Sequence, residues 1–300
     1  MTKTSALSTK YSRGGSIVKE MKQFENQIIC GDCLNVMPDL PDGCADMILA
    51  DVPYGTTACK WDSIIPLEPM WEQLKRLIKP NGAIVMTASQ PFTTTLIASN
   101  MKMFKYCWVW EKSNPANIAC SKIQPLKYHE DIVVFYSNQP TFNKQMIERD
   151  KLGRLRLQNK NNPIRFSGSA IQNKKGEKRD YDINRYDENL KNPSTVLKIK
   201  SERGKIHSTQ KPVALMEYLI KTYTNEGELV LDFACGSGTT CKAAQNLGRR
   251  FIGIEISPEY CEIAENRLNK VGMLGMDMIK ADDVIRAIQT YYTGGVLEFN

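Results

Sequence analysis

The sequence predicts an α/β fold in which a doubly wound, mostly parallel sheet carries helices on both faces. Short apolar runs suited to buried strands alternate with stretches of helical period along most of the chain, and this alternation is typical of parallel sheets. Two of the apolar runs end in polar or glycine-rich motifs, at Asp51 and at Asp232. A polar, basic segment over residues 138–206 interrupts the pattern once.

Composition narrows the classes of protein to consider. A chain of 300 residues suffices for one large α/β domain with an insertion, and an apolar content of 42% is ordinary for a globular protein. No apolar run is long enough to span a bilayer, and residues 1–24 lack the apolar core of a signal peptide, so we expect a flexible N-terminal segment and no membrane partner. Nine cysteines without framework spacing indicate a reducing compartment, hence the cytoplasm.

Cys30 and Cys33 form a single C-x-x-C motif. A structural zinc site needs a second pair of ligands, and the chain contains only two histidines. We therefore expect no metal site.

Residues 25–137 are expected to form the first half of the domain. Ala45–Ala50 is an apolar run that ends at Asp51, so the motif there lies at the carboxyl end of a strand. A helix with apolar residues at helical spacing follows over 67–78, and the turn signal of residues 79–82 ends it. The expected elements are strands over 25–33 and 45–50, the helix over 67–78, a strand over 83–87, a helix over 91–100, and strands over 106–110 and 131–136.

Residues 207–270 are expected to form the second half. Pro212 opens an amphipathic helix, a strand over 229–231 leads to Asp232, a helix follows over 240–247, and the next strand covers 251–254. Ser257 and Pro258 mark a helix start, because a capping side chain precedes a proline at the first helical position. Residues 271–300 form a C-terminal extension with a partly helical pattern, which we expect to pack on the core or to support a homodimer.

Charge is concentrated in the segment between the two halves. Residues 141–205 hold 17 Lys or Arg and 8 Asp or Glu, a net charge of +9, while the whole chain carries +7. Such a segment is either a solvated polar insertion or a surface that neutralises the phosphates of a nucleic acid. Charge alone does not separate these two interpretations.

A glycine-rich turn in the second half indicates a nucleotide-like ligand. A strand runs into Gly236-Ser237-Gly238 and a helix follows, so the backbone can approach a ligand and the helix N-terminus offers free N–H groups. The acidic residue that ends the next strand, Glu255, is placed to bind a ribose diol. A dinucleotide dehydrogenase would need a third glycine where Cys241 stands, so that fingerprint fails.

Together these segments resemble the cofactor motifs of class I S-adenosylmethionine-dependent methyltransferases, and in particular the β-group DNA amino-methyltransferases. The matching segments are Asp232–Thr240 with Phe251–Glu255, His207–Pro212, which is similar to the family's H-P-T-Q-K-P, and Gly31-Asp32. The resemblance implies a circularly permuted class I methyltransferase fold with a target-recognition insertion. One departure is that the aromatic of the family's D-P-F-x-G-S-G stands one position earlier, at Phe233.

The resemblance also implies S-adenosylmethionine as the cofactor and a role for each matching residue. Glu255 would hold the ribose hydroxyls, and Asp32 the adenine amino group. The Gly236-Ser237-Gly238 turn would pass beside the methionine moiety, with Lys211 near its carboxylate, and Asp232 would belong to the same cofactor site. His207 and Ser208 belong to the same cofactor-site segment as Lys211.

Asp51-Val52-Pro53-Tyr54 is a variant of the family's D-P-P-Y and indicates the chemistry. An exocyclic amine of a base is a poor nucleophile, because its lone pair is delocalised into the ring. Asp51 and the Pro53 carbonyl can each accept a hydrogen bond from the amine, and Tyr54 can stack on the base, which must first leave the double helix. Asp at the first position favours adenine N6, and N4 of cytosine is the alternative.

The resemblance implies duplex DNA as the partner. The insertion over 138–206 occupies the place of the target-recognition region, so we expect Arg154, Arg156 and Lys160 to contact phosphates. Lys112 and Asn114, just past a predicted strand, are expected to contact the target nucleotide.

Three alternatives stay open at this point. An RNA or protein-amide methyltransferase usually places its cofactor motif before the catalytic motif, the reverse of the order here. A non-catalytic DNA-binding subunit is permitted by Val52 and Ala234, if these departures weaken the site. A dehydrogenase is disfavoured by Cys241.

Overall fold

The computed structural model describes residues 21–55, 63–150, 189–202 and 210–277, with side chains up to Asn269. The chain divides into two compact units, one made of Met1–Phe142 with Val196–Asn300 and the other of Asn143–Thr195. Among its described residues the second unit contains a two-stranded antiparallel sheet, β6 (Ile147–Glu148) with β7 (Leu190–Lys191). No helix in the described ranges is both long and apolar enough to cross a membrane.

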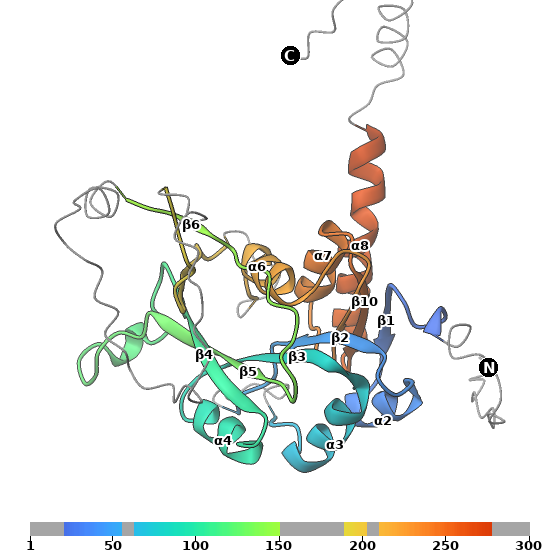
Figure 1. Ribbon diagram of the computed structural model, residues 1–300, viewed down its shortest axis with the longest axis horizontal. Helices are drawn as coiled ribbons and strands as arrows, with labels where there is room; N and C mark the ends of the chain where they lie inside the picture. Colours follow the sequence, from blue (N-terminus) through green and yellow to red (C-terminus); the bar gives the residue numbers. More distant parts are fainter. Residues whose placement is uncertain (1–20, 56–62, 151–188, 203–209, 278–300) are drawn as a thin grey trace, which may run out of the picture. The chain divides into compact units, whose positions relative to one another are not determined.

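The first unit is built on an eight-stranded sheet in the order β1-β10-β9-β2-β3-β5-β4-β8 (Figure 1). β1, β10, β9, β2 and β3 are all parallel, β5 is antiparallel to both of its neighbours, and β4 pairs with β8 in parallel. The strands are β1 (Gln27–Cys30), β2 (Ala45–Ala50), β3 (Ile78–Ala88), β4 (Phe104–Glu111), β5 (His129–Phe135), β8 (Val196–Lys198), β9 (Leu229–Asp232) and β10 (Arg250–Glu255). The predicted mostly parallel α/β sheet is thus confirmed.

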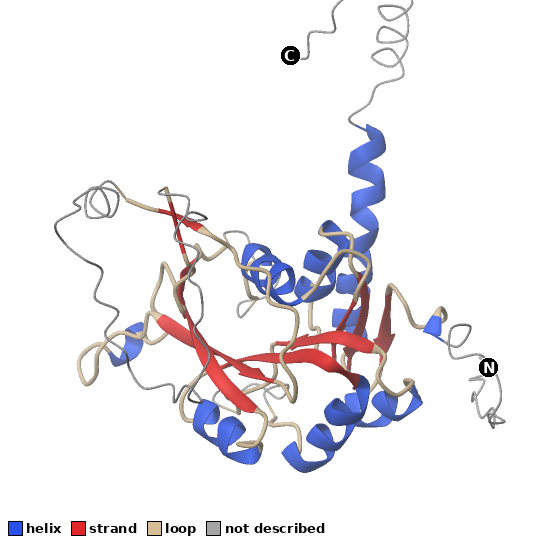
Figure 2. Ribbon diagram, in the orientation of Figure 1, coloured by secondary structure: helices blue, strands red, loops and turns tan. Residues whose placement is uncertain are grey.

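Helices cover both faces of this sheet, as Figures 1 and 2 show. Side chains of β2 alternate between two hydrophobic clusters, with Ile48 packing toward α2, α3 and α4, and Met47 toward α6 and α7. This two-sided burial explains why the strands read as continuous apolar runs. The helices are α2 (Cys33–Val36), α3 (Leu67–Leu77), α4 (Phe92–Ser99), α6 (Val213–Tyr223), α7 (Thr239–Asn246) and α8 (Pro258–Asp277), with short 3₁₀ helices η1 (Met37–Asp39) and η2 (Ile118–Cys120).

The turn predicted at residues 79–82 is wrong, because β3 runs through it from Ile78 to Ala88. The turn residues are accommodated as an irregularity in the ladder, where Ala45 pairs with Ile78 and Met47 pairs with Ala83. Gly82 is required there, since a Cβ on it would lie 2.7 Å from the Asp46 carbonyl oxygen. The local signal for a turn therefore marks a bulge inside a strand.

The central sheet also reaches into the segment that the sequence analysis treats as an insertion. β8 lies within residues 138–206 and pairs with the outer strand β4. Trp110 Nε1 donates a hydrogen bond to the Ile199 carbonyl oxygen at 2.8 Å. This bond joins the residues that follow β8 to β4. The separate compact unit, Asn143–Thr195, is accordingly shorter than that segment.

Candidate active site

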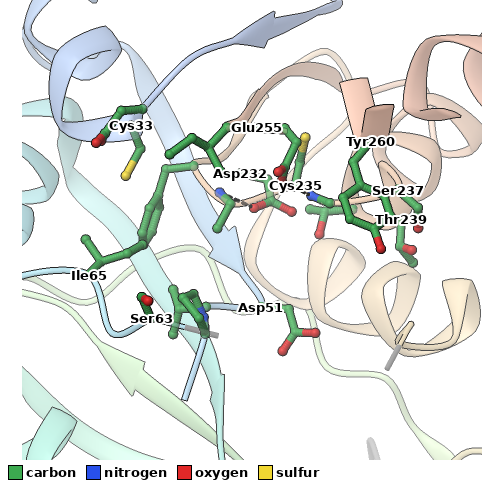
Figure 3. A pocket seen from close by; sticks show the side chains of 18 of the residues that line it. Cys33, Asp51, Ser63, Ile65, Asp232, Cys235, Ser237, Thr239, Glu255 and Tyr260 are labelled. Atoms are coloured by element: carbon green, nitrogen blue, oxygen red, sulfur yellow. Dashed lines mark hydrogen bonds between the residues drawn. The ribbon is translucent and has the colours of Figure 1, made fainter. Parts of the chain in front are cut away.

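A cavity of about 490 Å³ opens in the first unit where four neighbouring parallel strands end (Figure 3). Its walls contain the residues that directly follow or end β1, β10, β9 and β2. β9 continues through α7 to β10 on one side, whereas β2 continues through α3 to β3 on the other. Such a switch in direction between adjacent strands leaves a crevice at their carboxyl ends, which is where open α/β sheets bind ligands.

Most of the residues predicted from the two motifs meet in this cavity, although they come from positions up to 223 residues apart in the chain. The predicted residues that line it are Asp32, Asp51, Pro53, Tyr54, Lys211, Asp232, Gly236, Ser237 and Glu255. His207 and Ser208 lie outside the described residues. Figure 3 shows Asp51 separated from the group formed by Asp232, Cys235 and Glu255.

The glycine-rich turn has the backbone that its sequence requires. Gly236 has φ of 51° and Gly238 has φ of 75°, both in the left-handed region that favours glycine. A Cβ on Gly236 would meet no atom within 4 Å, so the backbone is open on that side. Gly238 is not among the residues that line the cavity; it caps α7, and a Cβ on it would lie 2.9 Å from the Ala264 Cβ. Because Gly238 has no Cβ, α8 can pack closely against the start of α7.

The carboxylates of Asp32, Asp232 and Glu255 line the cavity near the glycine-rich turn. The two oxygens of Glu255 accept hydrogen bonds from the backbone N–H groups of Gly236, at 2.8 Å, and Ser257, at 2.9 Å. Asp32 caps α2 by accepting from the Leu34 N–H at 2.8 Å. Burial raises the pKa of Asp232 from 3.8 to about 7, and hydrogen bonds from Thr240 and the Ala234 N–H oppose that rise.

These residues fit the nucleoside part of S-adenosylmethionine. Carboxylates held by backbone N–H groups are acceptors suited to ribose hydroxyls and an adenine amino group. Apolar side chains complete the walls, and they include Phe233, which lines the cavity despite standing one position earlier than the family's aromatic. Mostly apolar walls with a few placed polar groups are typical of small-molecule sites.

The Asp51 carboxylate is held by three side chains. Lys211 Nζ lies 2.7 Å from each of its oxygens, and the Thr87 hydroxyl donates to Oδ1. The Tyr54 hydroxyl donates to Oδ1 as well, at 3.0 Å, and the Tyr54 ring stacks on Phe92 with centroids 5.6 Å apart. Burial and the neighbouring Asp51 charge raise the pKa of Tyr54 well above its usual value, so its hydroxyl remains a donor.

Lys211 is a buried cation shared between two anions. Its side chain is 6% exposed, and its ammonium also lies 3.2 Å from Glu130 Oε2. Burial alone would lower the pKa of Lys211, but the Asp51, Tyr54 and Glu130 groups outweigh burial and hold the pKa well above its usual value. In this structure the ammonium is directed at Asp51, and its expected position beside a methionine carboxylate stays a prediction.

The sequence analysis missed Thr87, Phe92 and Glu130. Thr87 is the last residue but one of an apolar strand, and Phe92 opens a helix, so each looks like an ordinary core residue in the sequence. Glu130 carried a usable signal: Glu130 and Asp131 are two carboxylates that directly precede the apolar run of β5, which places them at the end of a strand.

The residues predicted to contact DNA are placed as follows. Lys112 Nζ forms an ion pair with Glu130 at 2.7 Å, and its side chain is 11% exposed. Its expected contact with the target nucleotide stays a prediction. Asn114 is exposed and does not line the cavity. Arg154, Arg156 and Lys160 lie outside the described residues.

Known proteins share the sequence pattern over most of the chain. A family model described as DNA methylase, for the N6/N4 methyltransferases, matches residues 45–266. The chain is 26% identical over 267 residues to the Type II methyltransferase M.HpaI of Haemophilus parainfluenzae, covering 82% of this chain and 75% of that protein. It is 28% identical over 295 residues to the Type II methyltransferase M2.LlaDCHI of Lactococcus lactis subsp. cremoris, covering 89% and 98%.

Solved structures share the fold. The crystal structure of M1.HpyAVI in complex with S-adenosylmethionine is 25% identical, with a TM-score of 0.54, covering 80% of this chain and 98% of that one. The PvuII cytosine-N4-specific DNA methyltransferase is 15% identical, with a TM-score of 0.56 over 80% and 85%, which shows the fold alone. From the family match, the permuted order of the motifs and their meeting in one cavity, we conclude that the chain belongs to the N6-adenine/N4-cytosine family of DNA methyltransferases, which use S-adenosylmethionine.

Proposed function

We propose that this DNA methyltransferase modifies N6 of adenine in duplex DNA, after the base has turned out of the double helix. The observation that carries the proposal is that the Asp51 carboxylate lines the same cavity as Glu255 and the Gly236 turn. The same cavity therefore contains both the acceptor for the target amine and the site for the methyl donor. Asp at the first position of the D-x-P-Y motif is the feature that favours adenine over cytosine.

The proposed mechanism depends on hydrogen-bond acceptors held in place before the base arrives. Asp51 accepts one N–H of the target amine and the Pro53 carbonyl accepts the other, which draws the nitrogen lone pair away from the ring. The ring of Tyr54 packs on the base. When bound, S-adenosylmethionine supplies a sulfonium methyl group that such a nitrogen can take. Positioning and fixed charges carry most of the rate enhancement in reactions of this kind.

Val52, the departure from D-P-P-Y, does not disturb this arrangement. Its side chain is 4% exposed and packs in the same hydrophobic cluster as α3 and β2. The position thus contributes to the core, and this supports a catalytic site over a non-catalytic subunit.

In the proposed cofactor site, Glu255 holds the ribose hydroxyls, Asp32 holds the adenine amino group, and the Gly236-Ser237-Gly238 turn passes beside the methionine moiety. His207, Ser208 and Lys211 belong to one segment that contributes to the cofactor site. The basic segment over 138–206 recognises the DNA target, with most of its cations on phosphates.

The product of methylation tests the proposal. The protein is incubated with unmethylated genomic DNA and methyl-labelled S-adenosylmethionine, the DNA is digested, and the labelled nucleoside is identified by mass spectrometry. We expect labelled N6-methyladenine from the parent and none from Asp51→Ala. N4-methylcytosine would correct the base and keep the mechanism. Labelling that is equal in Asp51→Ala, or absent from both proteins, would reject the catalytic assignment.

A further inference from the structure

Four charged side chains of alternating sign form a charge chain whose Asp51 end lies in the cavity. Lys112 pairs with Glu130 at 2.7 Å, Lys211 pairs with Glu130 at 3.2 Å, and Lys211 pairs with Asp51 at 2.7 Å. The side chains of Lys112, Glu130 and Lys211 are 11%, 14% and 6% exposed, whereas that of Asp51 is 29% exposed. Asp51 is therefore the accessible end of a charge chain that is otherwise buried.

Glu130 acts on this chain from outside the cavity. Asp51 and Lys211 line the cavity, whereas Glu130 and Lys112 are not among its lining residues. Glu130 lies near the start of β5, where it pairs with Trp110 of β4 and the next residue, Asp131, pairs with Ala88 of β3. Its position is thus set by the sheet and by Lys112, and it touches neither the base site nor the cofactor site.

The contact between Glu130 and Lys211 is electrostatic. Glu130 Oε2 is fully buried, and the ammonium of Lys211, 3.2 Å away, is the charge that compensates it. The Lys112 and Lys211 ammonium groups lower the pKa of Glu130 in spite of its burial, and Glu130 therefore stays ionised. A buried ion without compensation is costly, which ties Lys211 to Glu130 as well as to Asp51.

We propose that Glu130 is a positioning residue for methyl transfer, and this inference rests on the proposed function. By sharing the Lys211 ammonium, Glu130 holds it at a fixed place against the sheet. Asp51 consequently keeps the orientation and the acceptor capacity that the target amine needs. Without Glu130, the Lys211 ammonium interacts with Asp51 alone and moves together with the Asp51 side chain. It then binds the Asp51 oxygens more strongly, which leaves them weaker acceptors for the target amine.

The first test compares Glu130→Gln with the parent in a single turnover at saturating DNA and S-adenosylmethionine. We expect the rate constant to fall roughly 10- to 100-fold, because misplacing a reacting group by about 1 Å has an effect of that size. The dissociation constants for cofactor and DNA should stay within about twofold of the parent. Glu130→Asp keeps the charge and should recover most of the rate. Glu111→Gln is the matched control, since Glu111 also lies at this end of the β4–β5 pair but forms an exposed ion pair with Lys198.

A double variant separates positioning from stability. Glu130→Gln alone leaves one buried lysine uncompensated, whereas Lys112→Met with Glu130→Gln restores the charge balance. We expect the double variant to regain most of the lost thermal stability and to remain slow. A double variant that regains both stability and rate would overturn the proposal, as would Glu130→Gln with a parental rate. If the parent methylates DNA and Glu130→Gln is unaffected, only this inference fails; if the parent methylates no DNA, the proposed function fails and the positioning role fails with it.

Discussion

The ammonium of Lys211 lies 2.7 Å from both carboxylate oxygens of Asp51, although the two residues are 160 positions apart in the chain. This contact joins the D-x-P-Y motif to the segment that resembles a cofactor-site motif. It also means that the protein's own side chains hold the proposed acceptor of the target amine in one orientation. The consequence is that Lys211 contributes to the catalytic half of the site.

Replacing Lys211 with Met should therefore affect both stability and rate. The change leaves Asp51 and the buried Glu130 without their shared cation, and breaking a buried ion pair costs about 3–5 kcal/mol. We expect the free energy of unfolding in urea to fall by that order and methyl transfer to slow roughly 100-fold. Lys198→Met is the control, because the side chains of the Lys198–Glu111 pair are 76% and 43% exposed. Its loss should change stability by no more than about 1 kcal/mol. A Lys211→Met protein as stable as the Lys198→Met protein would contradict the argument from burial.

The raised pKa of Asp232 predicts a specific dependence of stability on pH. Its carboxyl group holds a proton up to about pH 7 in the folded protein, whereas its usual pKa is 3.8. Between these values the folded state binds one more proton than the unfolded chain, so the free energy of unfolding falls as pH rises across this window. The decrease due to this group is at most about 4 kcal/mol, at roughly 1.4 kcal/mol for each pKa unit.

Asp232→Asn removes this titration and gives the measurement. The stability of the variant relative to the parent should rise as the pH goes from about 4 to about 7 and then level off. Asp42→Asn is the control, because the Asp42 side chain is 79% exposed. Parallel pH profiles for the parent and Asp232→Asn, measured by urea unfolding, would show that Asp232 titrates normally.

Gly238 and Gly43 differ in one respect that a matched pair of variants can isolate. Both have positive φ, 75° and 60°, but only Gly238 faces a close neighbour, the Ala264 Cβ. Gly43→Ala should cost about 1–2 kcal/mol from backbone strain alone. Gly238→Ala should cost about 1–3 kcal/mol more, because α7 and α8 must separate to admit the methyl group. Thermal unfolding measures both losses of stability. Equal losses would mean that α7 and α8 can separate without a measurable cost in free energy.

The sequence was sufficient for the elements that bury apolar residues on both faces and for the motifs at their ends. Asp51, Asp232 and Glu255 follow strands, so their meeting at one edge of the sheet could be predicted from position alone. β8 could not be predicted, because only Leu197 of its three residues is buried and so short a segment shows no hydrophobic periodicity. The Glu130 partnership with Lys211 could not be predicted either, since a contact between distant residues depends on how the strands are ordered.

The basic segment over residues 138–206 is expected to bind duplex DNA through its cations. Arg154, Arg156 and Lys160 carry three of the 17 positive charges of residues 141–205, and their joint replacement by Ala should weaken duplex binding. If all three contact phosphates, the slope of log K against log salt should become less steep by about 0.9 for each, because fewer counterions are released. Cofactor affinity, measured by calorimetry, should not change.

The matched control replaces three exposed lysines of the first unit, Lys75, Lys102 and Lys105, with Ala. This removes the same charge from the molecule but not from the basic segment, so duplex affinity should fall much less and the salt slope should stay the same. Equal losses in the two triple variants would mean that net charge alone governs DNA binding. A salt slope that is unchanged in the Arg154, Arg156 and Lys160 variant would remove these residues from the interface and direct the search to other cations of the chain.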